Sequence, residues 1–183
     1  LGFKTNVPDE AFEHDLKYPD ARKIIQSLQQ TADNKRLTFG LKLSNTLESI
    51  NNKDEFGEEI SHMYMSGRAL HPLTVNLAAK LQSDFDGQLL LSFSGGADAF
   101  NVSQLMKCGF KTITVCSDLL KPGGYTRLNQ YFEQLRSDFI VLPSQNEALE
   151  NLKSYAENVI TNKAYQRQYL VLPNIKTKRE LDS

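Results

Sequence analysis

Two neighbouring stretches of the sequence place small and polar residues where a phosphate group could bind. Ser94-Gly95-Gly96 follows the apolar run "LLLSF", and Cys116-Ser117 follows the next run, "TITV". A phosphate needs hydrogen-bond donors, and exposed backbone N–H groups supply them. Glycine has no Cβ, so a phosphate can approach its backbone closely. If the two runs are neighbouring parallel strands, their ends lie roughly 5 Å apart and can hold one phosphate together.

The double glycine also has a simpler explanation. Glycines after a strand often form nothing more than a tight turn, so the pair alone does not establish a ligand site. The serine that ends the following strand strengthens the phosphate interpretation. The stretch is not G-x-G-x-x-G, and the chain contains no Gly-Lys-Ser or Gly-Lys-Thr. Neither the dinucleotide-binding fingerprint nor a P-loop is therefore indicated.

Two earlier loops offer further candidates. Lys42 lies inside the apolar stretch "FGLKLS", where a buried and unpaired amine would be costly. Near the carboxyl end of a strand, Lys42 could reach an anionic cofactor, or it could be an edge lysine whose amine extends into solvent. Asn45 follows that strand and could bond a ring or ribose edge. Ser66 and Gly67 precede a helix and form a third loop at the same rim.

The histidines are too far apart to form a pair, and we interpret each as a surface or capping residue: His14, His62 and His71.

Composition limits the classes of protein that remain. The 183 residues carry a net charge of −1, with 40% hydrophobic and 23% charged residues, which argues against a broad basic surface for nucleic acid. No apolar run approaches the roughly 20 residues that cross a bilayer. The two cysteines show neither metal-ligand spacing nor a disulfide framework. We expect a cytoplasmic protein that acts on a small molecule, and a chain that is part of a longer one.

Apolar periodicity predicts helices that alternate with strands. A first helix from Pro19 has a buried face that we assign to Ala21, Ile24, Ile25 and Leu28. The next helix, from Pro72, has a face that we assign to Leu73, Leu77 and Leu81. We predict strands at 37–44, 88–94 and 111–117, further helices after Gly96, over 128–139 and over 145–168, and a long loop at 45–62. The nearly continuous apolar run at 88–94 predicts a strand that is covered on both faces.

Alternation of this kind is typical of βαβ units with parallel strands, and therefore of an α/β protein. Doubly wound sheets and (β/α)8 barrels are both built in this way. In both, ligands bind at the carboxyl ends of the strands.

Longer stretches resemble a known family. "FGLKLSNTLES", "MYMSGRALHPLTVNLAAKL", "SFSGGADAF" and "ITVCSDLLKPGGY" resemble the bacterial selenate reductase subunits that are also labelled glutamate synthase homologues. More distantly, "KLSNT", "SGRAL", "SGG" and "VCS" are similar to the FMN barrel of dihydropyrimidine and dihydroorotate dehydrogenases. The resemblance implies a (β/α)8 TIM barrel with FMN at its carboxyl rim.

The resemblance also implies roles for individual residues. Lys42 matches the lysine that contacts the flavin in that family, and Ser66-Gly67 matches its Ser-Gly before a helix. The loops that hold the FMN phosphate match Gly95, Gly96, Cys116 and Ser117. The family's catalytic Cys or Ser loop has no recognisable counterpart here.

A complete barrel needs about 250 residues, so we expect only its C-terminal part in this chain. Residues 1–143 are assigned to that part and residues 144–183 to a C-terminal helical extension. Iron–sulfur clusters, FAD and NAD(P)H are expected in other domains of the parent reductase. An open sheet edge could also make the fragment self-associate.

The expected function is a fragment of a multidomain FMN-dependent oxidoreductase that moves electrons from NAD(P)H through the flavin. The alternative is a phosphate-binding barrel segment without flavin, either lyase-like or isomerase-like or a scaffold.

Overall fold

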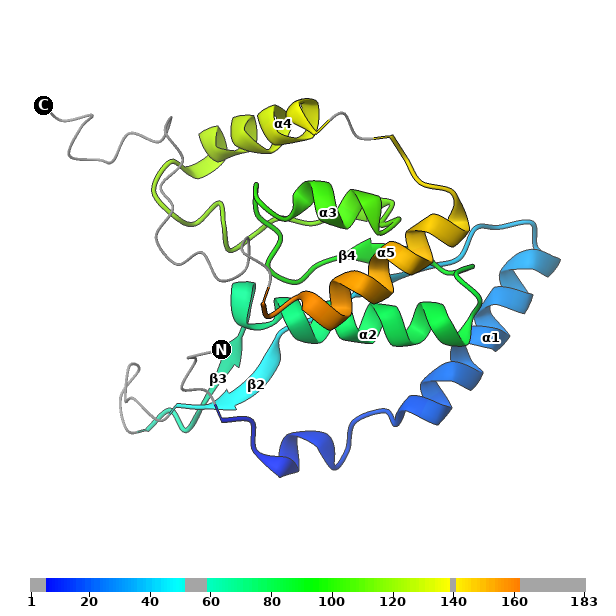
Figure 1. Ribbon diagram of the computed structural model, residues 1–183. Helices are drawn as coiled ribbons and strands as arrows, with labels where there is room; N and C mark the ends of the chain where they lie inside the picture. Colours follow the sequence, from blue (N-terminus) through cyan, green and yellow to red (C-terminus); the bar gives the residue numbers. More distant parts are fainter. Residues whose placement is uncertain (1–5, 52–58, 139–140, 162–183) are drawn as a thin grey trace, which may run out of the picture.

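The computed structural model describes residues 6–51, 59–138 and 141–161 (Figure 1). The helices are α1 (Tyr18–Asn34), α2 (His71–Asp84), α3 (Val102–Lys107), α4 (Leu128–Ser137) and α5 (Gln145–Asn158). The strands are β1 (Gly40–Leu43), β2 (Leu47–Ile50), β3 (His62–Met65), β4 (Leu90–Phe93) and β5 (Thr112–Ile113). Short 3-10 helices cover Asp9–Phe12, Gly67–Ala69 and Gly124–Arg127.

Three strands form a parallel sheet in the order β1-β4-β5. Leu43 pairs with Phe93, and Phe93 pairs with Ile113, so the three strands reach the same level. The predicted parallel arrangement is confirmed. Because the carboxyl ends of parallel strands meet at one edge of a sheet, the loops after β1, β4 and β5 lie at a common rim.

Helices cover one face of this sheet. Leu43, Leu91 and Phe93 point to that face and join the main hydrophobic core with residues of α1, α2 and α5. α2 and α5 pack against each other and lie side by side (Figure 1). Since side chains alternate along a strand, Lys42 and Ser92 point to the opposite face. In a (β/α)8 barrel the helices form the outer ring, so this opposite face corresponds to the barrel interior.

The opposite face explains one wrong prediction. β4 was expected to be covered on both sides, but burial alternates along it, and Leu90 is 39% exposed. A run of apolar residues does not distinguish a strand buried by packed helices from one whose second face requires further strands.

Local sequence signals fix where the helices begin and end. Pro72 occupies the first turn of α2, where its missing N–H is not needed. α5 starts with a capping box, in which Ser144 and Glu147 bond each other's backbone N–H groups. After α3, Gly109 takes a positive φ of 82°, which ends the helix.

The loop predicted at 45–62 is wrong at residues 47–50 and at His62, which belong to strands. β2 pairs antiparallel with β3, with Leu47 opposite Met65. Ser49 is buried in this hairpin and donates a hydrogen bond from Oγ to the carbonyl of Met63 at 3.2 Å. A buried polar residue interrupts the apolar alternation by which strands are recognised. Residues 52–58 lie outside the described residues.

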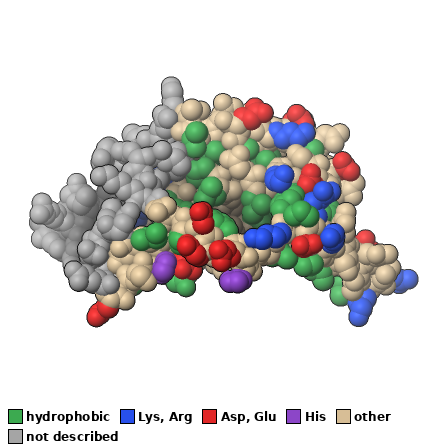
Figure 2. Space-filling view, turned by 90° about the horizontal axis from the view of Figure 1, so that it is seen from below, with side chains coloured by type: hydrophobic (Ala, Val, Ile, Leu, Met, Phe, Trp, Pro, Cys, Tyr) green, Lys and Arg blue, Asp and Glu red, His purple; other side chains and the backbone are tan. Residues whose placement is uncertain are grey.

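Several predicted buried faces are only half buried. Each helix keeps at least one apolar residue in the core, such as Ile25, Leu81 and Tyr131. Neighbours on the same predicted faces are between 45% and 54% exposed: Ile24, Leu28, Leu73 and Phe132. Periodicity identifies an apolar stripe but not the width of the partner that covers it. Figure 2 shows hydrophobic side chains between acidic and basic ones on the face seen from below, with no continuous basic surface.

α5 belongs to the same core as the βα units that precede it. Leu152, Tyr155 and Val159 are buried in the main cluster. The described helix ends at Asn158, whereas the sequence predicted a helix to 168. Residues 162–183 lie outside the described residues, and the boundary at 143/144 stays a prediction.

Candidate functional site

Three loops meet at the carboxyl rim of the sheet, and small residues allow the contact. A Cβ atom placed on Gly96 would lie 2.3 Å from the carbonyl oxygen of Gly67. A Cβ atom placed on Gly67 would lie 3.3 Å from the Cβ of Ser117. Gly67 and Gly96 also have positive φ values of 64° and 69°. We call this meeting point the Gly67–Gly96–Ser117 junction.

The junction unites residues from three of the four sequence stretches that were singled out. β4 and β5 are hydrogen-bonded neighbours, and the N–H of Thr114 donates to the carbonyl of Phe93 at 2.8 Å. The double-glycine turn and the serine after β5 therefore leave the sheet side by side. The glycines are also needed for packing, because a Cβ on Gly95 would lie 2.4 Å from Oγ1 of Thr74.

Backbone N–H groups at the junction remain available as donors. Within the described part of the chain, the N–H groups of Gly95, Gly96, Cys116 and Ser117 donate to no backbone or side-chain acceptor. Gly95 is buried, and Gly96 and Ser117 are half-buried. Most buried N–H groups in proteins have a partner, so the N–H of the buried Gly95 points to a ligand or to ordered water. The N–H groups of the more exposed Gly96, Cys116 and Ser117 lie beside it and are open to a ligand or to solvent.

Ser94 differs from its neighbours. Its N–H donates to the carbonyl of Leu43, and its carbonyl accepts from the N–H of Ser44 at 2.9 Å. The backbone of Ser94 thus extends the pairing of β1 with β4, and only its side chain is left for a ligand.

The remaining candidates lie around the same rim. Lys42 is exposed and pairs with Ser92, three residues and roughly 10 Å before the double-glycine turn. Asn45 is exposed, and its Oδ1 accepts a hydrogen bond from the N–H of Thr46 at 2.9 Å. Ser66 is exposed directly before the short 3-10 helix Gly67–Ala69. Cys116 is a free, exposed cysteine.

His71 supports the double-glycine turn through a hydrogen bond to Gly95. The sequence interpretation of His71 as a surface or capping residue is wrong. Its side chain is fully buried. Nδ1 lies 2.9 Å from the carbonyl oxygen of Gly95, and Nε2 lies 2.7 Å from the hydroxyl of Tyr155. A carbonyl only accepts hydrogen bonds, so Nδ1 carries the proton.

The imidazole of His71 is neutral. Burial lowers its pKa from the ordinary value, and the hydrogen bond to Gly95 opposes this only in part. In the neutral ring Nε2 is an acceptor, so the hydroxyl of Tyr155 donates to it. The only sequence signal is the position of His71 at the first turn of α2, and periodicity does not reveal its partner 84 residues away.

Asp118 fixes the loop that follows Ser117. Its buried carboxylate accepts from Nη2 of Arg127 at 2.9 Å, from Nζ of Lys121 at 3.0 Å and from the hydroxyl of Tyr131 at 2.8 Å. Burial alone would raise the pKa of Asp118, but these hydrogen bonds outweigh it and lower the pKa below its ordinary value. The sequence analysis did not identify this cluster, whose members lie up to 13 residues apart.

The segment after the double glycine is also built by side chains. Asn101 accepts the N–H of Asp98 at 2.9 Å and donates to the carbonyl of Gly96 at 3.0 Å. Asp98 in turn accepts the N–H of Phe100 at 2.9 Å. The turn is therefore held on both sides, by His71 before it and by Asn101 after it.

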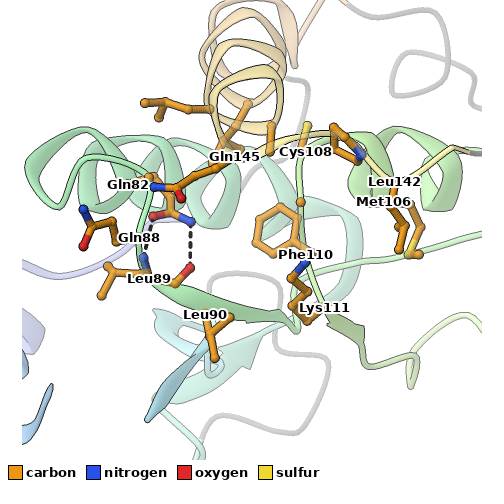
Figure 3. Close-up of a pocket in the computed structure, with 16 residues that line it drawn as sticks. Gln82, Gln88, Leu89, Leu90, Met106, Cys108, Phe110, Lys111, Leu142 and Gln145 are labelled. Carbon is orange, nitrogen blue, oxygen red and sulfur yellow. Dashed lines mark hydrogen bonds between the residues drawn. The ribbon is translucent and has the colours of Figure 1, made fainter. Parts of the chain in front are cut away.

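A separate cavity of about 390 Å³ lies at the other end of the sheet (Figure 3). It adjoins the amino-terminal ends of β4 and β5, at Leu89 and Lys111. The amide of Gln82 is occupied there, because it bonds both the N–H and the carbonyl of Leu89. Burial raises the pKa of the Cys108 thiol to about 12, so this thiol is protonated and unreactive. In TIM barrels this face serves stability rather than chemistry.

Residues 6–51, 59–138 and 141–161 contain neither a metal-binding cluster nor a membrane-spanning helix. No group of three or more His, Cys, Asp or Glu side chains is placed to share a metal ion. In the same residues, no helix has both the length and the apolar character for crossing a bilayer.

Comparison with known proteins identifies the family. A family model described as "Oxidoreductase YgfK, N-terminal TIM-barrel domain" matches residues 1–167. The chain belongs to this family. The YgfK proteins of Escherichia coli K12 and of Escherichia coli O157:H7 are each 41% identical to it over 177 residues. No solved structure matches the chain.

Membership in this YgfK family confirms part of the sequence interpretation. The fold is that of a TIM barrel, of which the described parallel sheet and its helices form a part. The match covers 96% of this chain but 17% of each relative. The labels of selenate reductase and glutamate synthase homologue stay predictions.

Proposed function

We propose that this chain is the FMN-binding part of a multidomain oxidoreductase and that the flavin phosphate binds at the Gly67–Gly96–Ser117 junction. One observation supports the site above all: two adjoining loops present N–H groups that have no acceptor in the described part of the chain. The description of the matching family as an oxidoreductase supports the class of reaction.

The donors fit a phosphate monoester. Gly95 and Gly96 offer N–H groups from the loop after β4, and Cys116 and Ser117 offer them from the loop after β5. Phosphate oxygens accept several such bonds at once, and backbone amides need no reorganisation to make them. The hydroxyl groups of Ser94 and Ser117 add donors at the same rim.

The remaining candidates suit the flavin ring. FMN, when bound, supplies the chemistry of hydride and electron transfer. Lys42 lies on the inner face of the sheet below the rim, where its ammonium group can stabilise negative charge on a reduced ring. The amide nitrogen of Asn45 and the hydroxyl of Ser66 can bond ring or ribitol edges.

The test compares FMN with riboflavin, which has the same ring but no phosphate. We expect the full-length protein to bind FMN with a yellow colour and quenched flavin fluorescence. FMN should bind at least about a hundredfold more tightly than riboflavin, because charge-assisted bonds to several amides each contribute about 1.5 kcal/mol or more. Equal affinities for the two flavins would contradict the proposed phosphate site, and a colourless protein would contradict the flavin.

A second candidate function is phosphate recognition without flavin, in a lyase-like or isomerase-like barrel or a scaffold. It is favoured by the fact that the junction itself offers only amide and hydroxyl donors, which any phosphate monoester can use. Binding of inorganic phosphate by a protein that does not bind FMN would favour this alternative. The other cofactors and the cytoplasmic location stay predictions.

A further inference from the structure

We propose that His71 is a positioning residue that, held by Tyr155, aims the Gly96 N–H at the bound phosphate. This inference rests on the proposed function, because it concerns the same phosphate site. It adds that α5, which follows the last strand of the described sheet in sequence, influences the affinity of that site through Tyr155.

The argument starts from a single peptide unit. The carbonyl of Gly95 and the N–H of Gly96 belong to one planar trans peptide, in which they point in opposite directions. Nδ1 of His71 donates to that carbonyl at 2.9 Å. Because the carbonyl is held toward the fully buried imidazole, the N–H of Gly96 points away from His71.

The hydrogen bond from His71 to the carbonyl of Gly95 also makes the N–H of Gly96 a stronger donor. A peptide whose carbonyl accepts a hydrogen bond is polarised, and its N–H becomes a better donor. The effect depends on the tautomer of His71, since only the Nδ1-protonated ring can donate to Gly95. The hydroxyl of Tyr155, 2.7 Å from Nε2, selects that tautomer by donating to the other nitrogen.

Packing fixes the ring in place. His71 contacts Phe93 edge to face at a centroid distance of 5.2 Å, and Tyr155 contacts His71 in the same way at 5.8 Å. Thr74, one turn further along α2, touches Gly95 and shares a 2.7 Å hydrogen bond with Ser44. The first turn of α2 therefore leaves the double-glycine turn little freedom.

The experiment uses matched substitutions at His71 in the full-length protein. Asparagine places its Nδ2 where Nδ1 stood and keeps the donor to Gly95, whereas glutamine reaches toward Tyr155 and loses that donor. We expect His71→Gln to lower the affinity for FMN about tenfold or more and His71→Asn to change it less than about threefold. Riboflavin affinity should change less than about threefold in both, because the ring contacts are untouched. His14→Gln, at an exposed histidine, is the control.

Tyr155→Phe provides the second variant, and it serves also if His71→Gln does not fold. Removing one hydroxyl should lower the FMN-to-riboflavin affinity ratio about threefold and speed hydrogen exchange of the amides at 94–97 without ligand. A His71→Gln protein and a Tyr155→Phe protein that both keep the wild-type ratio would overturn the positioning role alone. A wild-type protein that binds neither FMN nor inorganic phosphate would overturn the proposed function as well.

Discussion

Replacing Gly96 with alanine tests whether the three loops must touch at the junction. The new Cβ would lie 2.3 Å from the carbonyl oxygen of Gly67, 2.5 Å from its carbonyl carbon and 2.9 Å from the N–H nitrogen of Arg68. All three are backbone atoms, so no side-chain rotation relieves the overlap. The positive φ of 69° adds a second penalty.

The expected loss of stability follows from these two penalties, the steric overlap and the positive φ. A left-handed backbone costs a non-glycine residue about 1–2 kcal/mol, and overpacking costs about 1–3 kcal/mol. We expect Gly96→Ala to lower the free energy of unfolding by about 2–5 kcal/mol. Gly124→Ala is the matched control, because Gly124 has a positive φ of 49° and no atom within 4 Å of the added Cβ. This control should lose only about 1–2 kcal/mol.

Urea unfolding followed by circular dichroism measures both variants. The change in the unfolded chain is the same for both, since each replaces glycine with alanine, so it cancels in the comparison. If Gly96→Ala is as stable as Gly124→Ala within about 0.5 kcal/mol, the close contact between the loops at Gly67 and Gly96 is wrong.

Three further predictions concern charge, the cofactor and assembly. Asp118→Asn should cost about 3–5 kcal/mol in urea unfolding, because it leaves the half-buried Arg127 without its carboxylate. Since the folded pKa of Asp118 is lowered, wild-type stability should be complete above about pH 4 and fall as the pH drops through that lowered pKa, and Asp118→Asn should flatten this dependence. Lys42→Ala should weaken FMN binding or slow flavin reduction in the full-length protein, and unchanged titrations and stopped-flow rates would exclude a role for Lys42. The 183-residue chain should self-associate in sedimentation velocity, because β1 and β5 are the edges of the described sheet and Leu90 is exposed; a monomer at all concentrations would contradict this.

The candidate site could be located from the sequence because the residues that indicate it lie close together in the chain. A strand, a double glycine and a helix follow one another within a few residues, and the parallel arrangement then fixes where the next strand ends. β4 and β5 pair in that way, and Gly96 and Ser117 both lie against Gly67. Whether Lys42, Asn45 and Ser66 contact a flavin stays a prediction.

The residues that support the site could not be located in this way. His71 and Tyr155 are 84 residues apart, and neither has a neighbour in sequence that signals a buried hydrogen bond. The hairpin of β2 and β3 was hidden for a similar reason, because the buried Ser49 breaks the apolar alternation. Polar residues inside a core are recognised only when their partners are known.

The sequence by itself determined the alternation of strands and helices, the parallel sheet and the residues that follow each strand, because these depend on periodicity and on glycine. The tertiary structure alone decided which apolar faces are covered, which histidine is buried and which carboxylate anchors a loop. Those features depend on contacts between residues far apart in the chain. Burial and hydrogen bonding are properties of the assembled neighbours and not of any one stretch of sequence.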